Sequence, residues 1–411
     1  METETKENKG KQQILFVLHT LSVGGAERQL SSVANEMARR GAQVQILLID
    51  APTVLFDLHP AVRVVCVNQK ATAATAENTA PCTLFRMKKA PRLSAVEKIR
   101  LSWAHLFDKK RAQYLEQEAY LKLSFALPLR EYLAQYPDAT VISCMTIPNL
   151  STMMALQTLP NRAIFSDRTD PQTEYPPSSP YCRMKRRYYP RAQAAVFQTP
   201  QARDYYTFLP ETKKYLIPNF IDGAKYPPRY TGQRRHVIVN FCRLQPVKNL
   251  PLLFDAFALL HGDAPDYRLE IYGEGAIRAS LEQKIREMGM TQWITIHDFD
   301  LQIHEKIRDV AMFVSSSDRE GISNSMLEAM AIGLPTVCTD CPAGGARMTI
   351  RDGENGLLVP VGDCRALYLA MKRLLEEEGL SERLSQNSVH IREELTLDRI
   401  CGLWETAIED A

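Results

Sequence analysis

The sequence predicts an α/β protein with two domains, each built around a parallel sheet. Three observations favour this class. The chain has 411 residues, enough for two domains of ordinary size. Short apolar runs alternate with amphipathic runs in both halves, as in βαβ units. A turn-rich stretch at 217–235, containing several Pro and Gly, separates the halves.

The first half opens with a predicted βαβ unit. Residues 14–18 and 44–49 are short apolar runs typical of buried strands. Between them, 26–40 carries apolar residues at helical spacing, and Gly41 follows as the expected C-terminal glycine. Because βαβ crossovers join parallel strands, this opening predicts a parallel sheet. Three later apolar runs, at 141–144, 163–166 and 194–198, predict further strands.

The second half repeats the alternation from His236 onward. The predicted strands are 237–241, 268–272, 294–297, 311–315 and 334–338, and the predicted helices are 249–261, 276–288, 324–331, 365–377 and 381–409. We therefore expect an N-terminal domain at 12–222 and a C-terminal domain at 236–392. Ligands of such open sheets bind beyond the carboxyl ends of the strands.

Composition excludes several classes of protein. Apolar content of 45% and charged content of 24% are typical of soluble globular chains, and a net charge of +2 does not indicate a nucleic-acid partner. No run of 18 uncharged apolar residues predicts a membrane span. The polar start at 1–11 does not resemble a secretory signal, and nine scattered Cys indicate reduced thiols in a cytoplasm. Cys338 and Cys341 form a lone pair of thiols, more typical of buried residues than of a metal site.

The segment from Glu320 to Glu328 is the most informative in the chain. Its two carboxylates lie eight residues apart, with Gly321 and small polar residues between them. A strand is predicted before this segment, and a helix is predicted to carry its second half. The amides and the helix N-terminus there predict a site for phosphate or diphosphate. The two carboxylates are expected to bind hydroxyls on either side, or to act as general acid and base.

Arg243 and Lys248 follow the first strand of the second half. Both precede a predicted helix, so both are expected near the strand ends. Two cations at that position can neutralise a diphosphate leaving group by electrostatic stabilisation. The alternative is that they are ordinary solvated surface charges.

Two glycine-containing loops are further candidates. Gly24 and Gly25 lie between a predicted strand and helix, where glycines allow a diphosphate to approach the backbone. A dinucleotide fingerprint with Asp50 as the ribose acid is disfavoured because the GxGxxG spacing is absent, and a plain tight turn is the remaining alternative. Gly273 and Glu274 follow another strand and predict a loop near a base or ribose, again with a simple turn as the alternative.

Residues 83–111 form a basic, amphipathic stretch. It holds nine Lys or Arg against Glu97 and Asp108, with interleaved apolar residues that include Trp103. A segment of this kind can lie on an anionic membrane surface. The alternative is a solvated helical hairpin packed on the domain.

Taken in order, these motifs resemble glycosyltransferase family 4, a family with the GT-B fold. The resemblance covers about residues 12 to 409 and rests on 24–28, 217–219, 243–249, 272–275, 320–328 and 352–359. It implies two facing Rossmann-like domains with a cleft between them, and a C-terminal helix at 393–411 that packs back on the N-terminal domain. The N-terminal domain would bind the acceptor and the C-terminal domain the nucleotide-sugar.

The resemblance also implies roles for single residues. Arg243 and Lys248 would hold the donor diphosphate, Glu320 would contact the transferred sugar, and Glu328 would contact the ribose. The implied donor-binding set is completed by Gly24, Gly25, Gly273, Glu274, Gly321, Ile322, Ser323, Met326 and Leu327.

Acceptor-side residues are less defined. His19, Asp167 and Arg168 are candidates because they come at the ends of predicted strands. The Ser-Asp-Arg sequence at 166–168 resembles a Ser-Glu-Arg found in enzymes that extend lipid-linked or capsular oligosaccharides. Asp167 is one methylene shorter than that Glu. Arg347 or Met348 also takes a place in a loop where many members carry a Glu.

The predicted function is that of a retaining, metal-independent hexosyltransferase without a cofactor. The donor would be a nucleotide-sugar, UDP-linked by expectation, and the acceptor a glycan or a polyprenyl-diphosphate-linked saccharide. We expect a cytoplasmic protein, peripheral on the inner membrane face through residues 83–111. A nucleotide-sugar epimerase on the same fold and a non-catalytic sugar-nucleotide-binding protein are the alternatives.

Overall fold

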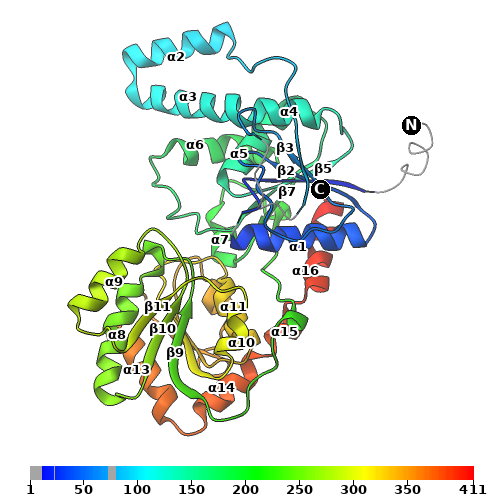
Figure 1. The fold of residues 1–411 in the computed structure, drawn as a ribbon. Helices are drawn as coiled ribbons and strands as arrows, with labels where there is room; N and C mark the ends of the chain where they lie inside the picture. The colour runs from blue at the N-terminus through cyan, green and yellow to red at the C-terminus, as the bar shows by residue number, and fades with distance from the viewer. Residues whose placement is uncertain (1–11, 23, 73–79) are drawn as a thin grey trace. The chain divides into compact units, whose positions relative to one another are not determined.

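A computed structural model describes residues 12–22, 24–72 and 80–411 of the chain. These residues form two compact units, both coloured along the chain in Figure 1. The N-terminal unit runs to Phe197 and also holds 203–217 and 397–411. The C-terminal unit holds 198–202 and 218–396.

The N-terminal unit is built on an eight-stranded sheet with the order β4-β3-β2-β1-β5-β6-β7-β8. Every neighbouring pair in it is parallel. The strands are β1 (Gln13–Leu18), β2 (Gln43–Leu48), β3 (Arg63–Cys66), β4 (Cys82–Leu84), β5 (Thr140–Cys144), β6 (Ala163–Asp167), β7 (Ala194–Phe197) and β8 (Lys214–Leu216). The three central strands β1, β5 and β6 are almost wholly buried, as expected for a parallel sheet covered on both faces.

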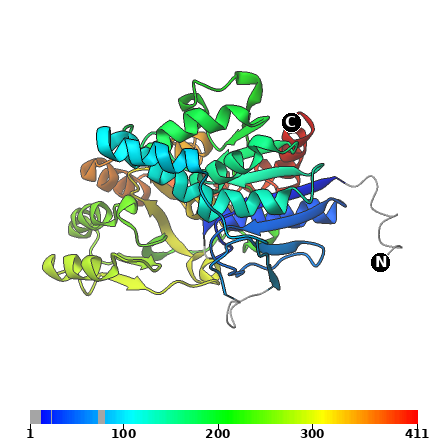
Figure 2. The ribbon, with the colours of Figure 1, turned by 90° about the horizontal axis from the view of Figure 1, so that it is seen from above.

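Helices of the N-terminal unit connect these strands. They are α1 (Gly25–Arg39), α2 (Ala95–Phe107), α3 (Lys109–Leu121), α4 (Leu127–Leu133), α5 (Thr146–Ala155), α6 (Pro180–Tyr188) and α16 (Leu397–Glu409), and α7 (Pro200–Tyr205) lies where the chain changes unit. A π-helical turn at Lys122–Ala126 joins α3 to α4. Figures 1 and 2 show α2 and α3 as a helical hairpin.

The C-terminal unit has a six-stranded sheet with the order β11-β10-β9-β12-β13-β14, again parallel throughout. Its strands are β9 (Arg235–Phe241), β10 (Arg268–Tyr272), β11 (Ile294–His297), β12 (Val310–Ser315), β13 (Thr336–Thr339) and β14 (Leu357–Val359). Its helices are α8 (Leu250–Asp263), α9 (Arg278–Glu287), α10 (Ile303–Ile307), α11 (Asn324–Ala331), α12 (Gly345–Thr349), α13 (Cys364–Glu376), α14 (Leu380–Ser388) and α15 (Ile391–Glu394).

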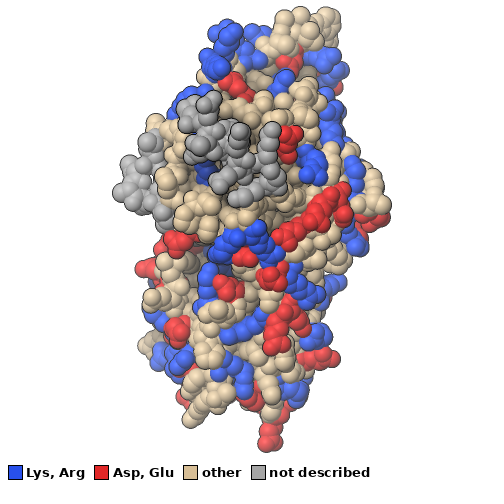
Figure 3. Space-filling view, turned by 90° about the vertical axis from the view of Figure 1, so that its right-hand side faces the viewer, with Lys and Arg blue, Asp and Glu red and all other residues tan. Residues whose placement is uncertain are grey.

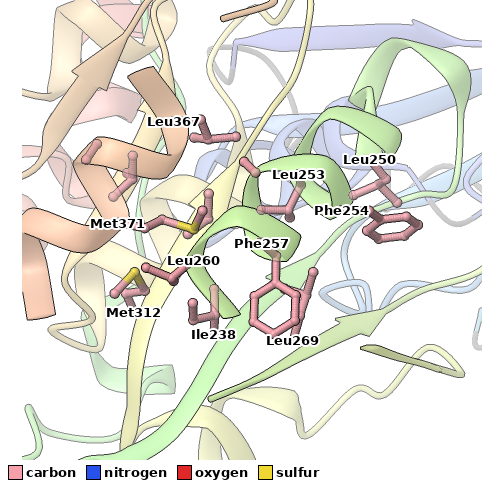
Figure 4. Packing of buried hydrophobic residues seen from close by; sticks show 14 of the residues in the cluster. Ile238, Leu250, Leu253, Phe254, Phe257, Leu260, Leu269, Met312, Leu367 and Met371 are labelled. Atoms are coloured by element: carbon pink, nitrogen blue, oxygen red, sulfur yellow. The ribbon is translucent and has the colours of Figure 1, made fainter. Parts of the chain in front are cut away.

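The core of the C-terminal unit fixes its strand ends. Side chains of α8 and α13 pack on one face of the sheet, where Leu260 of α8 lies beside Met371 of α13 and Met312 of β12 (Figure 4). All three are fully buried. A second cluster, which includes Met326 and Leu327 of α11, packs on strand residues such as Phe313. Because α8 and α11 are both held by packed side chains, the loops before them have a fixed position.

The predicted α/β class with two parallel sheets is confirmed. The prediction of α11 at 324–331 matches the observed bounds, and Gly333 after it adopts a positive φ of 75°. Strands β3, β4, β8 and β14, each of three or four residues, were not among the predicted strands.

The prediction of one helical run at 381–409 was wrong. The run divides into α14, α15 and α16, with breaks after Ser388 and Glu394. The chain passes from the C-terminal to the N-terminal unit between 396 and 397, two residues after α15 ends.

Helix α16 confirms that the C-terminal helix packs back on the N-terminal unit. It begins at Leu397 rather than at the predicted 393. Its Trp404 is fully buried. Arg40, which follows α1, bonds Asp398 at 2.6 Å and Glu405 at 2.9 Å. The chain changes unit at 217–218 and again at 396–397, whereas the predicted domains were 12–222 and 236–392.

Candidate active site

Lys248 and Glu320 meet at the carboxyl end of the C-terminal sheet. Lys248 lies in the loop between β9 and α8, and Glu320 in the loop between β12 and α11. β9 and β12 are neighbours in the sheet, so their following loops are adjacent. The ammonium of Lys248 donates to Oε1 of Glu320, and both side chains keep about a fifth of their surface exposed, 17% and 20%. A ligand can therefore reach this ion pair from solvent.

Hydrogen bonds between the two loops hold Lys248 in place. The amide of Asp318 donates to the carbonyl of Val247 at 2.9 Å, and the Asn249 side chain donates to Asp318 at 2.7 Å. The hydroxyl of Ser316 donates to the carbonyls of Lys248 and Asn249, each at 3.0 Å. Asn249 adopts a left-handed conformation with φ 42°, which short polar side chains tolerate.

Glu320 is fixed by the loop that follows β13. Its amide donates to the carbonyl of Pro342 at 2.7 Å, and its carbonyl accepts from the amide of Ala343 at 2.8 Å. A Cβ on Gly345 would stand only 1.8 Å from the carbonyl oxygen of Gly321, so only glycine fits there. Ser317 donates to Oε1 of Glu320 at 3.0 Å. The carboxylate is thus oriented before any ligand binds.

Gly273 packs its loop against the loop after β9. A Cβ on Gly273 would lie 1.9 Å from the carbonyl oxygen of Cys242. At Gly275 the corresponding distance, to the carbonyl of Leu244, is 2.1 Å. The amide of Leu244 also donates to the carbonyl of Glu274 at 2.7 Å. Both glycines are therefore required by close backbone approach within the unit. The predicted approach of this loop to a base or ribose stays a prediction.

The surroundings of Lys248 keep its side chain positively charged. Burial favours the neutral amine of Lys248, but the negative charge and the hydrogen bond of Glu320, together with nearby Cys242 and Cys341, outweigh it and raise the pKa of Lys248 above its ordinary value. Lys248 is therefore a fixed cation at neutral pH. Such a cation beside a carboxylate can bind a phosphate oxygen while the carboxylate accepts a hydroxyl.

Glu328 lies inside α11 with only 5% of its surface exposed. Oε2 of Glu328 is 2.9 Å from Nε2 of His304, which comes from α10. The imidazole is itself packed edge-on against Tyr226 and Phe241, with ring centroids 4.8 and 5.8 Å apart. The sequence reasoning did not find His304, because 24 residues separate it from Glu328 and only the fold brings them together.

Several backbone amides at the start of α11 already donate hydrogen bonds to groups of the protein. Ser323 caps the helix by accepting from the amide of Met326 at 3.4 Å, and its carbonyl accepts from Leu327. The amide of Ile322 donates to the side chain of Gln198 at 3.4 Å. Asn219 donates to the carbonyl of Ile322 at 3.1 Å. The amides of Ile322, Met326 and Leu327 therefore already have partners, and the side chains of these three residues belong to the core.

The remaining candidates of the C-terminal unit lie on its surface or support it. Arg243 and Glu274 are exposed beyond β9 and β10. His297, at the end of β11, stacks on Tyr272 with ring centroids 4.5 Å apart. Arg347 forms an ion pair with Asp340 at 2.6 Å. All nine cysteines, Cys338 and Cys341 included, are free thiols.

The described residues of the N-terminal unit place His19 and Gly25 at accessible positions. His19 follows β1, and its Nδ1 is 3.4 Å from Oδ2 of Asp50, with both side chains well exposed. Gly24 precedes α1 in an extended conformation, and Gly25 is exposed at the first turn. The predicted approach of Gly24 and Gly25 to a donor bound on the other unit stays a prediction.

Asp167, by contrast, is buried in a polar cluster. Its Oδ2 accepts from the ammonium of Lys185 at 3.2 Å and from the hydroxyl of Tyr206. The same ammonium donates to Glu174 at 2.8 Å, and Thr146 donates to Glu174 at 2.9 Å. Burial raises the pKa of Glu174, and the charge of nearby Asp167 adds to that shift. This burial weighs against direct contact between Asp167 and an acceptor.

Arg168 is also buried, with 9% exposure. Its guanidinium lies 5.9 Å from the ring centroid of Trp404 in α16. Burial lowers the pKa of Arg168. The contact joins the end of β6 to the C-terminal helix, which is a packing role. Among the described residues, no group of three or more His, Cys, Asp or Glu side chains is arranged to hold a metal ion.

Residues 235–377 match the family model described as Glycosyl transferases group 1. This segment is similar to the group 1 glycosyl transferases. It covers the sheet, α11, and both Lys248 and Glu320.

Relatives carry matching names. EpsD of Bacillus subtilis, a protein named as a glycosyltransferase, is 35% identical over 150 residues, which are 36% of this chain and 39% of EpsD. The N-acetylgalactosamine-N,N'-diacetylbacillosaminyl-diphospho-undecaprenol 4-alpha-N-acetylgalactosaminyltransferase of Campylobacter jejuni is 33% identical over 143 residues, 35% of this chain and 38% of the relative. The matched part of the chain thus spans less than two fifths of the length of these relatives.

Solved structures show the fold. Anabaena HepE in complex with UDP and glucose matches with a TM-score of 0.71 at 15% identity, over 97% of this chain and 100% of that one. The lipopolysaccharide outer core galactosyltransferase WaaB matches with a TM-score of 0.65 at 17% identity, over 97% and 99%. The chain therefore has the GT-B architecture of two Rossmann-like parallel-sheet units.

Proposed function

We propose that this protein is a retaining glycosyltransferase that takes a sugar from a nucleotide-sugar, UDP-linked by preference, for cell-surface polysaccharide synthesis. The observation that carries the proposal is the partly exposed Lys248–Glu320 pair at the carboxyl end of a parallel sheet. The segment that matches the group 1 model contains both residues of this pair, and UDP and glucose are the ligands in the HepE structure. The proposed acceptor is a glycan or a polyprenyl-diphosphate-linked saccharide, the class named for the Campylobacter relative.

The proposed chemistry uses the geometry of this pair. As the bond between the anomeric carbon and the diphosphate breaks, negative charge grows on the leaving phosphate oxygen. Lys248 is held there as a cation, and exposed Arg243 adds a second one. These two cations together would stabilise this charge and supply the role that a metal has elsewhere, so we propose that no metal is needed. Glu320 binds a hydroxyl of the transferred sugar, and its neighbour Ser317 keeps the carboxylate oriented.

Glu328 is assigned to the ribose of the donor. Its carboxylate is buried and is held by His304, so its position is set by the protein rather than by the ligand. A carboxylate that is held in place before the ligand binds favours one arrangement of the ribose hydroxyls that donate to it.

A donor screen tests the proposal. The protein is incubated with a panel of nucleotide-sugars and a polyprenyl-diphosphate-linked saccharide, and release of nucleoside diphosphate is followed with and without EDTA. We expect acceptor-dependent release from a UDP-sugar that EDTA does not reduce, and a product with the anomeric configuration of the donor by NMR. Conversion of the donor sugar without acceptor would instead indicate the epimerase, and binding without turnover a sugar-nucleotide-binding protein.

A further inference from the structure

Helix α2 carries an uncovered apolar stripe. Val96, Ile99, Trp103, Leu106 and Phe107 recur at helical spacing and fall within one third of the helix circumference. Between 57% and 75% of the surface of each residue is exposed. Trp103 and Phe107 lie one turn apart with ring centroids 5.3 Å apart. Isolated apolar residues on a protein surface are common, but a patch of five large, solvent-exposed apolar side chains on one helix is not and requires an explanation.

The opposite side of α2 is the side that packs on the protein. Ala104 there has only 5% exposure, and Glu97 bonds Lys122 beyond the end of α3. Ser94 and Glu97 form a capping box that starts the helix. Figure 2, which looks down on the N-terminal unit, shows α2 in cyan on the viewer's side. The helix is thus well anchored, and its apolar stripe points away from the anchoring face.

A group of cations lies on α2 and in the chain segments directly before and after it. Its members are Lys88, Lys89, Arg92, Lys98, Arg100, Lys109, Lys110 and Arg111. All are exposed, and among the described residues none is within ion-pair distance of a carboxylate. The nearby acids are already used, since Glu97 pairs with Lys122 and Asp108 accepts from the amide of Arg111 to cap α3. Blue cations and tan residues gather at the top of Figure 3, the height at which Figure 1 draws α2.

The apolar stripe and the nearby cations together fit the surface of a lipid bilayer with anionic headgroups. An apolar stripe with an aromatic pair fits the boundary between lipid headgroups and acyl chains, and unpaired cations beside it fit anionic headgroups. A second copy of the chain fits poorly, because stripe-to-stripe packing would bring two sets of eight cations together.

We propose that the outer face of α2 binds an anionic lipid bilayer. The helix lies parallel to the membrane, its five apolar side chains enter the headgroup boundary, and the eight cations bind lipid phosphates. This docking rests on α2 and the start of α3 alone, so it stands apart from the proposed transfer reaction. Among the described residues no helix is long and apolar enough to cross a membrane, and docking of this kind needs none.

Vesicle flotation of the full chain tests the proposal. Vesicles of phosphatidylcholine alone are compared with vesicles in which about a third of the lipid is phosphatidylglycerol. We expect binding to the anionic vesicles only, weakened by added salt because screening reduces the attraction. Leu106→Ser with Phe107→Ser, and separately Lys109→Glu with Lys110→Glu, should each weaken that binding at least about tenfold.

Matched controls lie in the C-terminal unit. Leu259 and Leu369 are exposed leucines, 49% and 42%, so Leu259→Ser with Leu369→Ser should leave vesicle binding unchanged. Arg286→Glu with Arg365→Glu is the corresponding charge control. The shift in melting temperature caused by UDP is measured on every variant and should stay at the wild-type value, which separates docking from donor binding. Equal binding to both vesicle types, no binding to either, or dimerisation lost in the stripe variant would each overturn the proposal.

Discussion

The strand ends of the two units hold charged clusters of opposite character. In the C-terminal unit one lysine meets one carboxylate, Lys248 with Glu320, and both are about a fifth exposed. In the N-terminal unit one lysine, Lys185, meets two carboxylates, and its side chain is only 5% exposed. Asp167 at the centre of that cluster is fully buried.

This difference in exposure distinguishes a candidate ligand-binding site from a cluster that stabilises the fold. An exposed pair can exchange one partner for a ligand at little cost, because solvent screens the intermediate state. A buried cluster cannot, since removing one charge leaves the others desolvated. The comparison teaches that a polar residue at a strand end is a site candidate only when the fold leaves it accessible. Four predictions test this contrast.

The largest effect is expected from Lys185→Met. The change leaves the carboxylates of Asp167 and Glu174 facing each other in a buried place, which should destabilise the N-terminal unit by about 3–5 kcal/mol. Lys122→Met is the control, because its ion pair with Glu97 is about one third exposed and should be worth at most about 1 kcal/mol. Calorimetric melting of both variants gives the comparison. An unchanged transition in Lys185→Met would remove the distinction between the two clusters.

Lys248→Ala should mainly affect turnover. It removes one of the two cations proposed to stabilise the leaving diphosphate, so kcat should fall by about 10²–10³-fold. Because the pair is partly exposed, the melting temperature should change little. Lys284→Ala, on the outer helix α9, serves as a control with wild-type activity. Retention of full activity in Lys248→Ala would show that the site assignment is wrong.

His304→Gln should give a smaller effect of a different kind. Glutamine cannot reproduce the ring packing that orients the bond to Glu328, so KM for the donor should rise by about tenfold while kcat changes less. Steady-state kinetics at varied donor concentration separate the two constants. A pure loss of kcat would assign His304 to the chemical step instead.

The smallest effect concerns pH. Burial raises the pKa of Glu174 above its ordinary 4.5, so the folded state holds a proton there more tightly than the unfolded chain. The stability from this proton is present below about pH 4.5 and is lost as pH rises through the raised pKa. Glu174→Gln removes this proton-dependent contribution. The melting temperature of the wild type, measured relative to that of the variant, should therefore fall as the pH rises from below about 4.5 through the raised pKa. A difference independent of pH would contradict the raised pKa.

Most of the fold could be predicted from the sequence, because long strands and helices produce a recognisable spacing of apolar residues. The βαβ opening and α11 are examples, whereas β14 and the breaks around α15 involve too few residues to produce one. The Lys248–Glu320 loops could be placed at strand ends because parallel strands end at one edge. Their direct contact, and the partners His304 and Lys185, depend on tertiary packing between segments distant in sequence. The exposure of Glu320 and the burial of Asp167 likewise have no local signal.

Calorimetric titration of UDP tests the central claim most directly, because it measures the proposed diphosphate site without acceptor or turnover. Wild type, Lys248→Met and the matched control Lys284→Met are compared at one salt concentration. We predict saturable binding by wild type and the control, and a loss of about tenfold to a hundredfold in Lys248→Met, the strength of a hydrogen bond to a charged group. Equal affinity in all three proteins would contradict the account and place the nucleotide elsewhere.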